Sequence, residues 1–188
     1  MTLLVAGLLL FTGSHLFMSV GAGALDALRQ RLGAGPVKGL LAMLIGGGLA
    51  LIVVGWRASE VLWLYALPPL VRAPAFALIA CGIYLMVVSG RASRVKRVLR
   101  HPQLTGVLLW AIAHLLLNGD LRSVALFGGL ALWSVLEILL INRRDGPWVR
   151  PEAPPLATDA VTALVAVLVL GALVWAHPWL AGVSVYVG

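Results

Sequence analysis

Charged side chains are scarce in this chain of 188 residues, because Lys, Arg, Asp and Glu together make up only 11% of it. A soluble domain carries about 25% charged residues, so the composition excludes a water-soluble globular fold. Disorder is excluded as well, since 61% of the residues are apolar and disordered chains are poor in such residues. The composition is that of a polytopic membrane protein.

Cysteine is almost absent from the chain. The single cysteine, Cys81, excludes a disulfide within the chain. It lies inside an apolar run, where a free thiol behaves as a small hydrophobic residue. We therefore do not count Cys81 among the candidate site residues.

Long apolar stretches predict an all-α integral membrane protein, a single bundle of about six transmembrane helices over residues 1–188. The expected spans are Leu3 to Val20, Lys38 to Trp56, Ala73 to Ser89, Gln103 to Leu117, Ser123 to Ile141 and Ala160 to Ala176. The fourth stretch is short for a span, so we expect it to tilt or to extend into the preceding Arg-His-Pro segment.

Basic residues are distributed unevenly among the connecting segments. Those after the first, third and fifth spans hold Arg29, Arg31, Lys38, Arg91, Arg94, Lys96, Arg97, Arg100, Arg143, Arg144 and Arg150; the others hold Arg57, Arg72 and Arg122. The positive-inside rule places the larger set in the cytoplasm, so both termini are expected on the outer, periplasmic side. We therefore attribute the net charge of +7 to the orientation of the chain in the membrane, and we expect no nucleic-acid partner.

Small residues inside the spans indicate where helices approach closely. The sequence has three consecutive glycines at Gly46–Gly48 and a pair at Gly128–Gly129. Without side chains, these positions let neighbouring helix backbones come into contact. We expect both glycine groups to lie at helix–helix contacts.

Polar side chains within spans are costly and mark candidate sites. In this chain they include His15, Ser19, His114, Asn118 and Glu137. At about 1.5 Å per residue, His15 lies about 12 Å and His114 about 18 Å from the cytoplasmic face. Two histidines at similar depth on different helices can bind a haem iron from both faces. The structural alternative for each histidine is a hydrogen bond to a neighbouring helix.

The segment Arg100-His101-Pro102 combines basic side chains with a helix start. Proline favours the first turn of a helix, and a helix N-terminus attracts anions. We assign Arg100 and His101 to a cofactor propionate or a phosphate-like group, with lipid headgroups as the alternative.

Two acidic residues have structural interpretations. Asp120 follows the Asn118-Gly119 turn and is placed to cap the next helix through free backbone N–H groups. Glu137 lies near the inner end of its helix, and we expect it to reach the interface or to pair with Arg143 or Arg144.

Three segments resemble the conserved motifs of the NnrU family. They are residues 11–19 (FTGSHLFMS), 100–106 (RHPQLTG) and 109–120 (LWAIAHLLLNGD). The resemblance covers the chain up to about Arg144, with the helix at 160–176 as an addition. It implies a bacterial inner-membrane protein that acts in the context of nitrite and nitric oxide reduction.

The NnrU family is similar to the 15-cis-zeta-carotene isomerases, which are integral membrane haem b proteins. The resemblance places the axial ligands of the iron at His15 and His114. We add Ser19, Asn118, Arg100 and His101 to the expected haem site. The implied partners are the lipid bilayer, haem and an electron-transfer or denitrification protein.

Cis-trans isomerisation is implied less strongly than haem binding. The isomerases carry a further histidine in the next helix, where this chain reads LWSVLE at 132–137. An isomerase that depends on that histidine would not find it here.

Two other functions stay open at this point. In a membrane methyltransferase resembling the isoprenylcysteine carboxyl methyltransferases, Arg100 and His101 would hold S-adenosylmethionine near Glu137. In a haem-free structural or assembly subunit, the histidines would only connect helices. The oligomeric state is open as well.

Overall fold

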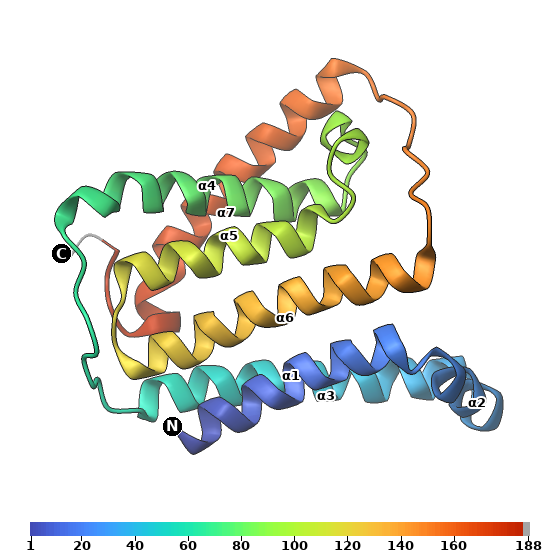
Figure 1. Cartoon of the computed structure of the whole chain (residues 1–188), viewed down its shortest axis with the longest axis horizontal. Helices are drawn as coiled ribbons and strands as arrows, with labels where there is room; N and C mark the ends of the chain where they lie inside the picture. The colour runs from blue at the N-terminus through green and yellow to red at the C-terminus, as the bar shows by residue number, and fades with distance from the viewer. Residues whose placement is uncertain (186–188) are drawn as a thin grey trace.

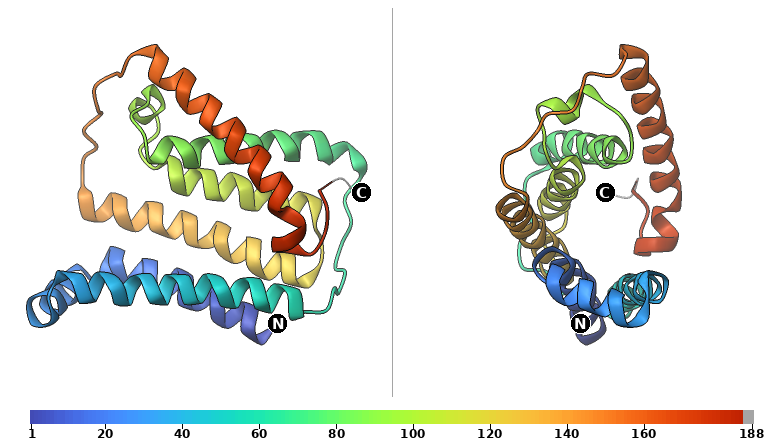
Figure 2. Two further views of the ribbon diagram at one scale, coloured as in Figure 1. Left: turned by 180° about the vertical axis from the view of Figure 1, so that it is seen from behind. Right: turned by 90° about the vertical axis from the view of Figure 1, so that its right-hand side faces the viewer.

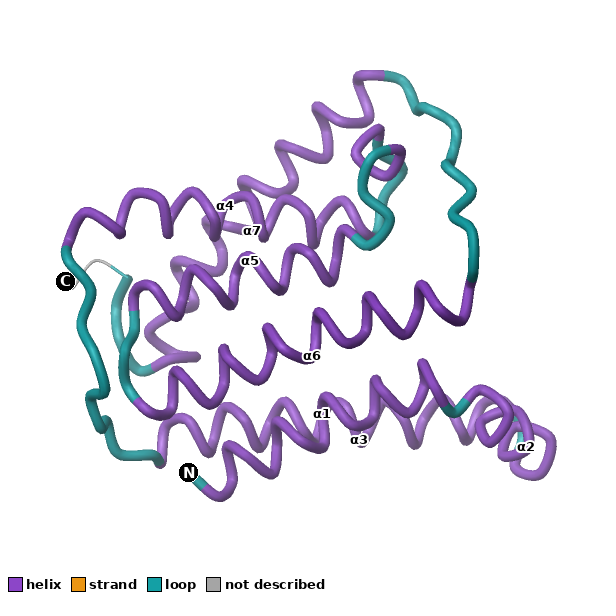
Figure 3. The backbone as a smooth tube through the Cα atoms, viewed as in Figure 1, coloured by secondary structure: helices purple, strands orange, loops and turns teal. Residues whose placement is uncertain are grey.

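Helices make up nearly all of the regular structure in the computed structural model, which describes residues 1–185 (Figures 1 and 3). They are α1 (Thr2–Val20), α2 (Ala22–Leu32), α3 (Ala34–Ala58), α4 (Arg72–Ser89), α5 (Pro102–Leu117), α6 (Leu121–Asp145) and α7 (Leu156–Ala181), with 3-10 helices η1 (Pro69–Val71) and η2 (Arg94–Arg97). Within the described residues there is no strand, only an isolated bridge between Trp63 and Asp120.

Each of the six expected spans is helical, and five are long and apolar enough to cross a membrane. The exception is α5, whose 16 residues rise about 24 Å, less than the roughly 30 Å of a hydrocarbon core. The all-helical membrane architecture is confirmed. The count of six spans stays a prediction, as does the side of the membrane that the termini face.

The helices lie in a row in the order α3, α1, α6, α5, α4 and α7. The end view in Figure 2 shows that the row curves, and α7 slants back across it toward α3. Buried side chains from α1, α3, α5 and α6 form the core: Leu4, Leu8, Ile52, Ala111, Leu126, Phe127, Leu130 and Trp133. Thus α6 lies between two helix pairs, α1 with α3 and α5 with α4.

The two ends of the bundle differ in charge. Helices α1, α4 and α6 end where α3, α5 and α7 begin (Figure 1). The eleven basic residues of the connecting segments gather at this end, which we call the basic end. The start of α1 and the end of α7 lie together at the opposite end.

Glycines allow backbone contact within each helix pair. A Cβ added at Gly55 of α3 would lie 2.2 Å from the backbone N of Leu4 in α1, and one at Gly48 would lie 2.8 Å from the N of Phe11. In the other pair, a Cβ at Gly82 of α4 would lie 2.7 Å from the carbonyl oxygen of Gly106 in α5. Such contacts give the close van der Waals packing that, with interhelical hydrogen bonds, drives helix association in lipid.

The glycines predicted from sequence are only partly at contacts. In addition to Gly48, Gly129 faces another helix, with a Leu8 methyl 2.5 Å from its added Cβ. An added Cβ at Gly46, Gly47 or Gly128 meets nothing within 4 Å. Successive residues of a helix point about 100° apart, so only part of a glycine run can face one neighbour.

The last helix is held at both of its ends. At the basic end, the Ser93 hydroxyl donates to Oδ1 of Asp159 at 2.7 Å, and Arg91 Nε donates to the Thr162 hydroxyl at 3.1 Å. At the opposite end, Trp56 Nε1 of α3 donates to the carbonyl of Ala181 at 3.1 Å. These bonds fix the slant of α7 between α4 and α3.

A short helix not predicted from the sequence, α2, occupies part of the first connecting segment. This helix has 11 residues and projects sideways at the basic end (Figure 1). Leu25, Leu28 and Leu32 share one face at helical spacing, and Leu25 is buried. A short helix with leucines on one face, flanked by Arg29 on one side and Arg31 on the other, is typical of the membrane interface.

We predict opposite effects for the same substitution at two glycines of α3. Gly55→Ala forces a methyl against the Leu4 backbone, so we expect it to lower the free energy of unfolding by about 1–3 kcal/mol. Gly46→Ala meets open space and gains helix propensity of up to about 1 kcal/mol. Thermal unfolding midpoints in detergent measure both; equal midpoints for the two variants would contradict the close α1–α3 contact.

Candidate functional site

His15 lies on α1 where this helix packs against α6. Its Nδ1 lies 2.8 Å from the carbonyl oxygen of Phe11, one turn earlier in α1. Because a carbonyl only accepts, Nδ1 carries a proton, and in the neutral imidazole the lone pair is then on Nε2. The imidazole contacts the rings of Phe11 and Trp133, with ring centroids 4.6 and 5.2 Å away.

His114 lies on α5 in a matching local arrangement. Its Nδ1 lies 2.8 Å from the carbonyl oxygen of Trp110, again one turn earlier. The imidazole stacks on Phe127 of α6, with centroids 4.4 Å apart and planes 29° from parallel. As at His15, an aromatic residue precedes the histidine by four positions, and Nε2 is the nitrogen left with a lone pair.

The two histidines contact the same helix at different heights. Trp133 and Phe127 are six residues apart, which is about 9 Å along α6. Because α6 starts at the opposite end of the bundle and Phe127 precedes Trp133, His114 lies nearer that end than His15 does. The structure thus brings both imidazoles to α6, each against a different aromatic ring.

Both hydrogen bonds of the histidines stay within their own helices. The structural alternative was that the histidines connect neighbouring helices by hydrogen bonds. Nδ1 of neither residue forms such a bond. Helix contacts at these positions come from the rings instead: His15 meets Trp133 edge-on, and His114 stacks on Phe127.

Ser19 and Glu137 form a buried polar contact one turn beyond His15. The Ser19 hydroxyl donates to Oε2 of Glu137, and Trp133 Nε1 donates to Oε1 at 3.3 Å. Glu137 is 2% exposed, so the expectation that it reaches the interface or pairs with Arg143 or Arg144 is wrong. Donors on α1 and α6 satisfy this carboxyl group inside the bundle, which makes a surface partner unnecessary.

Asn118 forms a hydrogen bond at the end of α5, the helix that carries His114. Its Nδ2 donates to the carbonyl of His114 at 3.1 Å. The neighbouring Gly119 is required by close packing, because an added Cβ would lie 2.0 Å from the carbonyl oxygen of Tyr65. The Tyr65 hydroxyl donates to the carbonyl of Leu115 at 2.6 Å, and partial burial together with the charge of Asp120 raises the pKa of this phenol.

Asp120 caps α6 as the sequence predicts. Oδ1 accepts from the backbone N of Ser123 at 3.1 Å, and Oδ2 accepts from its hydroxyl at 2.6 Å. Arg122 lies 3.3 Å from the same carboxylate and stacks over the Trp56 ring at 4.4 Å. The turn between α5 and α6 is thereby fixed against α3.

Arg100 and His101 lie at the basic end of α5, with Pro102 in its first turn. His101 Nε2 lies 2.9 Å from Oδ1 of Asn142, and Arg100 Nη1 donates to the carbonyl of Gly146 at 2.8 Å. His101 and His114 are 13 residues apart, or about 20 Å along the helix. The structure therefore groups Arg100 and His101 with the end of α6 and not with His114.

The long apolar helices and their polar side chains define a multi-pass helical membrane protein. The family model described as NnrU protein matches residues 3–185, and the chain belongs to this family. The match extends through the last helix. No curated protein and no solved structure matches the chain.

The donor chemistry of His15 and of His114, each taken singly, is that of a metal-binding histidine. Histidines that bind metals commonly donate their other ring N–H to a backbone carbonyl, which is what both Nδ1 atoms do here. Within residues 1–185 no three His, Cys, Asp or Glu side chains gather to hold a metal ion. A haem iron takes its equatorial ligands from the porphyrin, so two histidines complete its coordination.

The aromatic rings around the two histidines were not among the residues predicted from the sequence. Phe11 and Trp110 precede them by four residues, and Phe127 and Trp133 face them from α6. The shared aromatic-to-histidine spacing was visible in the sequence. The α6 rings depend on how helices pack, which no single segment reveals.

We predict that Ser19→Ala destabilises the protein whereas Ser14→Ala does not. Both serines lie on α1 and are 8% exposed, but the Ser14 hydroxyl bonds only within its helix, to Leu10. Loss of the bond to Glu137 is expected to cost about 1–2 kcal/mol, high for an interhelical bond in lipid because the acceptor is a carboxyl group. Unfolding of both variants in detergent measures the difference, and equal stability would contradict the contact.

Proposed function

We propose that this NnrU-family protein binds haem b within the membrane, with His15 and His114 as the axial ligands. One observation carries the proposal: each imidazole has its Nδ1 fixed by a backbone carbonyl, so that Nε2 is available to a metal. The same tautomer at both positions gives each Nε2 the donor chemistry of a metal ligand, and both imidazoles contact α6.

Bound haem b would supply one-electron redox chemistry to the protein. With both axial positions filled by side chains, electron transfer is favoured over gas binding. His15 and His114 would hold the iron, and Phe11, Trp110 and the rings of α6 would give both imidazoles aromatic surroundings. An electron-transfer partner in nitrite or nitric oxide reduction, at the bacterial inner membrane, is part of the same proposal.

Other residues of the site have positioning roles in this proposal. Ser19 and Trp133 hold the Glu137 carboxyl one turn from His15. Asn118 donates a hydrogen bond to the carbonyl of His114 at the end of α5. Arg100 and His101 bond to the end of α6, away from His114, and have no part in holding the iron in this proposal.

Absorption spectra of the detergent-purified protein test the proposal. Expressed with haem supplied, the wild type should give a low-spin haem b spectrum when oxidised and when reduced with dithionite. His15→Ala and His114→Ala should each lose haem or convert it to a high-spin form, because each removes one axial nitrogen. His101→Ala is the matched control and should leave the spectrum unchanged.

A colourless wild type would overturn haem binding, and S-adenosylmethionine binding at Arg100 and His101 would be the next measurement. A wild-type spectrum that survives His114→Ala would overturn the assigned ligand pair. Size-exclusion profiles of the variants separate loss of haem from loss of the fold.

A further inference from the structure

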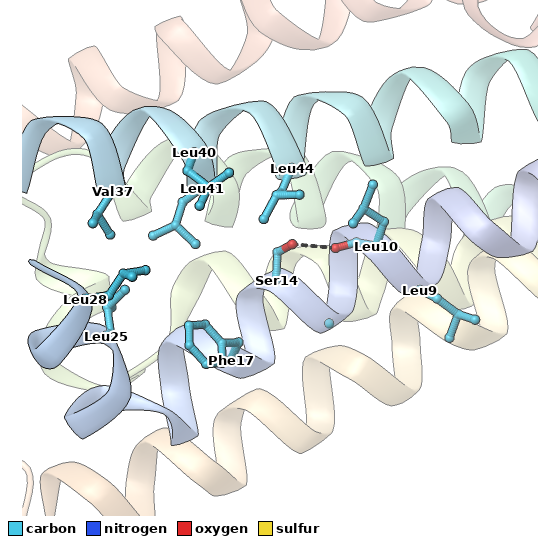
Figure 4. A pocket seen from close by; sticks show the side chains of 11 residues that line it. Leu9, Leu10, Ser14, Phe17, Leu25, Leu28, Val37, Leu40, Leu41 and Leu44 are labelled. Carbon is cyan, nitrogen blue, oxygen red and sulfur yellow. Dashed lines mark hydrogen bonds between the residues drawn. The ribbon is translucent and has the colours of Figure 1, made fainter. Parts of the chain in front are cut away.

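Two cavities adjoin at the basic end of the α1–α3 pair, where α2 turns away from the bundle. The smaller measures about 320 Å³ and lies between α1, α2 and α3; leucine side chains from all three helices point into it (Figure 4). The larger, of about 610 Å³, is lined by the same three helices. Val37 and Leu41 of α3 line both cavities.

The smaller cavity offers almost no polar atom to a ligand. Ser14 is the one polar side chain among its lining residues. The Ser14 hydroxyl already donates to the carbonyl of Leu10 in its own helix, at 2.7 Å (Figure 4). Leu28, Leu44 and Phe17 are typical of the remaining lining, so this cavity suits a hydrocarbon chain.

The larger cavity changes from charged to apolar along α3. Lys38 is followed on the same face by Leu41, Ala42 and Ile45, at the three-, four- and seven-residue spacing of one helix side. This stripe descends about 10 Å from Lys38 to Ile45. Arg29 of α2 also lines the cavity, so two cations and an apolar wall border one space.

Both cations are available to a ligand. Among the described residues, the Lys38 ammonium has no hydrogen-bond or ion-pair partner. Arg29 pairs with Asp26 at 3.0 Å, but the two side chains are 48% and 62% exposed. Exposed ion pairs of this kind are weak and screened, so Arg29 can exchange Asp26 for a stronger anion.

We propose that these cavities bind one anionic phospholipid from the leaflet at the basic end. Lys38 and Arg29 bind the phosphate, and the acyl chains lie on either side of Val37 and Leu41. A choline headgroup would bring a further cation beside Lys38 and Arg29, so the site favours an anionic lipid. This inference is independent of haem binding.

Native mass spectrometry of the full-length protein tests the site, with phosphatidylglycerol and phosphatidylcholine of identical acyl chains as probes. A basic residue at an anionic lipid surface is worth about fivefold in affinity, so wild type should retain phosphatidylglycerol about 25-fold more strongly. The double variant Lys38→Gln/Arg29→Gln should lose this preference. Lys38→Arg keeps the charge and should retain it.

Arg143→Gln/Arg144→Gln is the matched control, because it removes two charges at the same end but on α6. It should keep the preference for phosphatidylglycerol. Gly13→Leu tests the apolar cavity: an added Cβ at Gly13 meets nothing within 4 Å, so the leucine can fill the space. Binding of two-chain phosphatidylglycerol should fall, while the single-chain lysolipid should bind as before.

Equal retention of the two lipids by the wild type would overturn the proposal. A preference that survives Lys38→Gln/Arg29→Gln, or one that disappears in the Arg143→Gln/Arg144→Gln control, would show general charge attraction in place of this site. Circular dichroism of each variant confirms that the helices have formed.

Discussion

Backbone contact at glycine is the interaction on which the rest of the structure depends. Lipid tails are as apolar as leucine, so the hydrophobic effect does not drive helices together in a membrane, and close packing must do so. Gly48 and Gly55 bring α3 onto α1, while Gly82 and Gly106 bring α4 onto α5. The result is two tightly packed helix pairs, one carrying His15 and the other His114.

The helix between the pairs, α6, determines how the two histidines relate. It runs parallel to α1, so Trp133 faces His15 and Glu137 faces Ser19, in step along both helices. On its other side Phe127 stacks on His114. Side chains of α6 therefore connect the two helix pairs. A cofactor held by both histidines would be a second connection between them.

The sequence predicted well those features that a single segment determines. Run length and hydropathy located the helices, because the bilayer thickness sets both. The helix cap at Asp120 and the helix start at Pro102 were likewise readable, since each needs only its neighbours in the chain.

The remaining features depend on packing between distant segments. The partner of Glu137 is Ser19, 118 residues away, whereas the sequence offered only the arginines on its own helix. Helix α2 was missed because its 11 residues mix leucines with charges and are too short to span a bilayer. Which glycine of a run faces a neighbour also required the structure, as the contrast between Gly48 and Gly46 illustrates.

Whether His15 and His114 bind one iron is tested most directly by pulsed electron paramagnetic resonance of the oxidised protein with ¹⁵N-labelled histidine. Two-histidine ligation predicts hyperfine coupling from two iron-bound imidazole nitrogens, one from each histidine. In His15→Ala and in His114→Ala the coupling should come from one iron-bound imidazole nitrogen, or be lost with the haem. Coupling from a single imidazole in the wild type, or a two-nitrogen signal that persists in either variant, would contradict it.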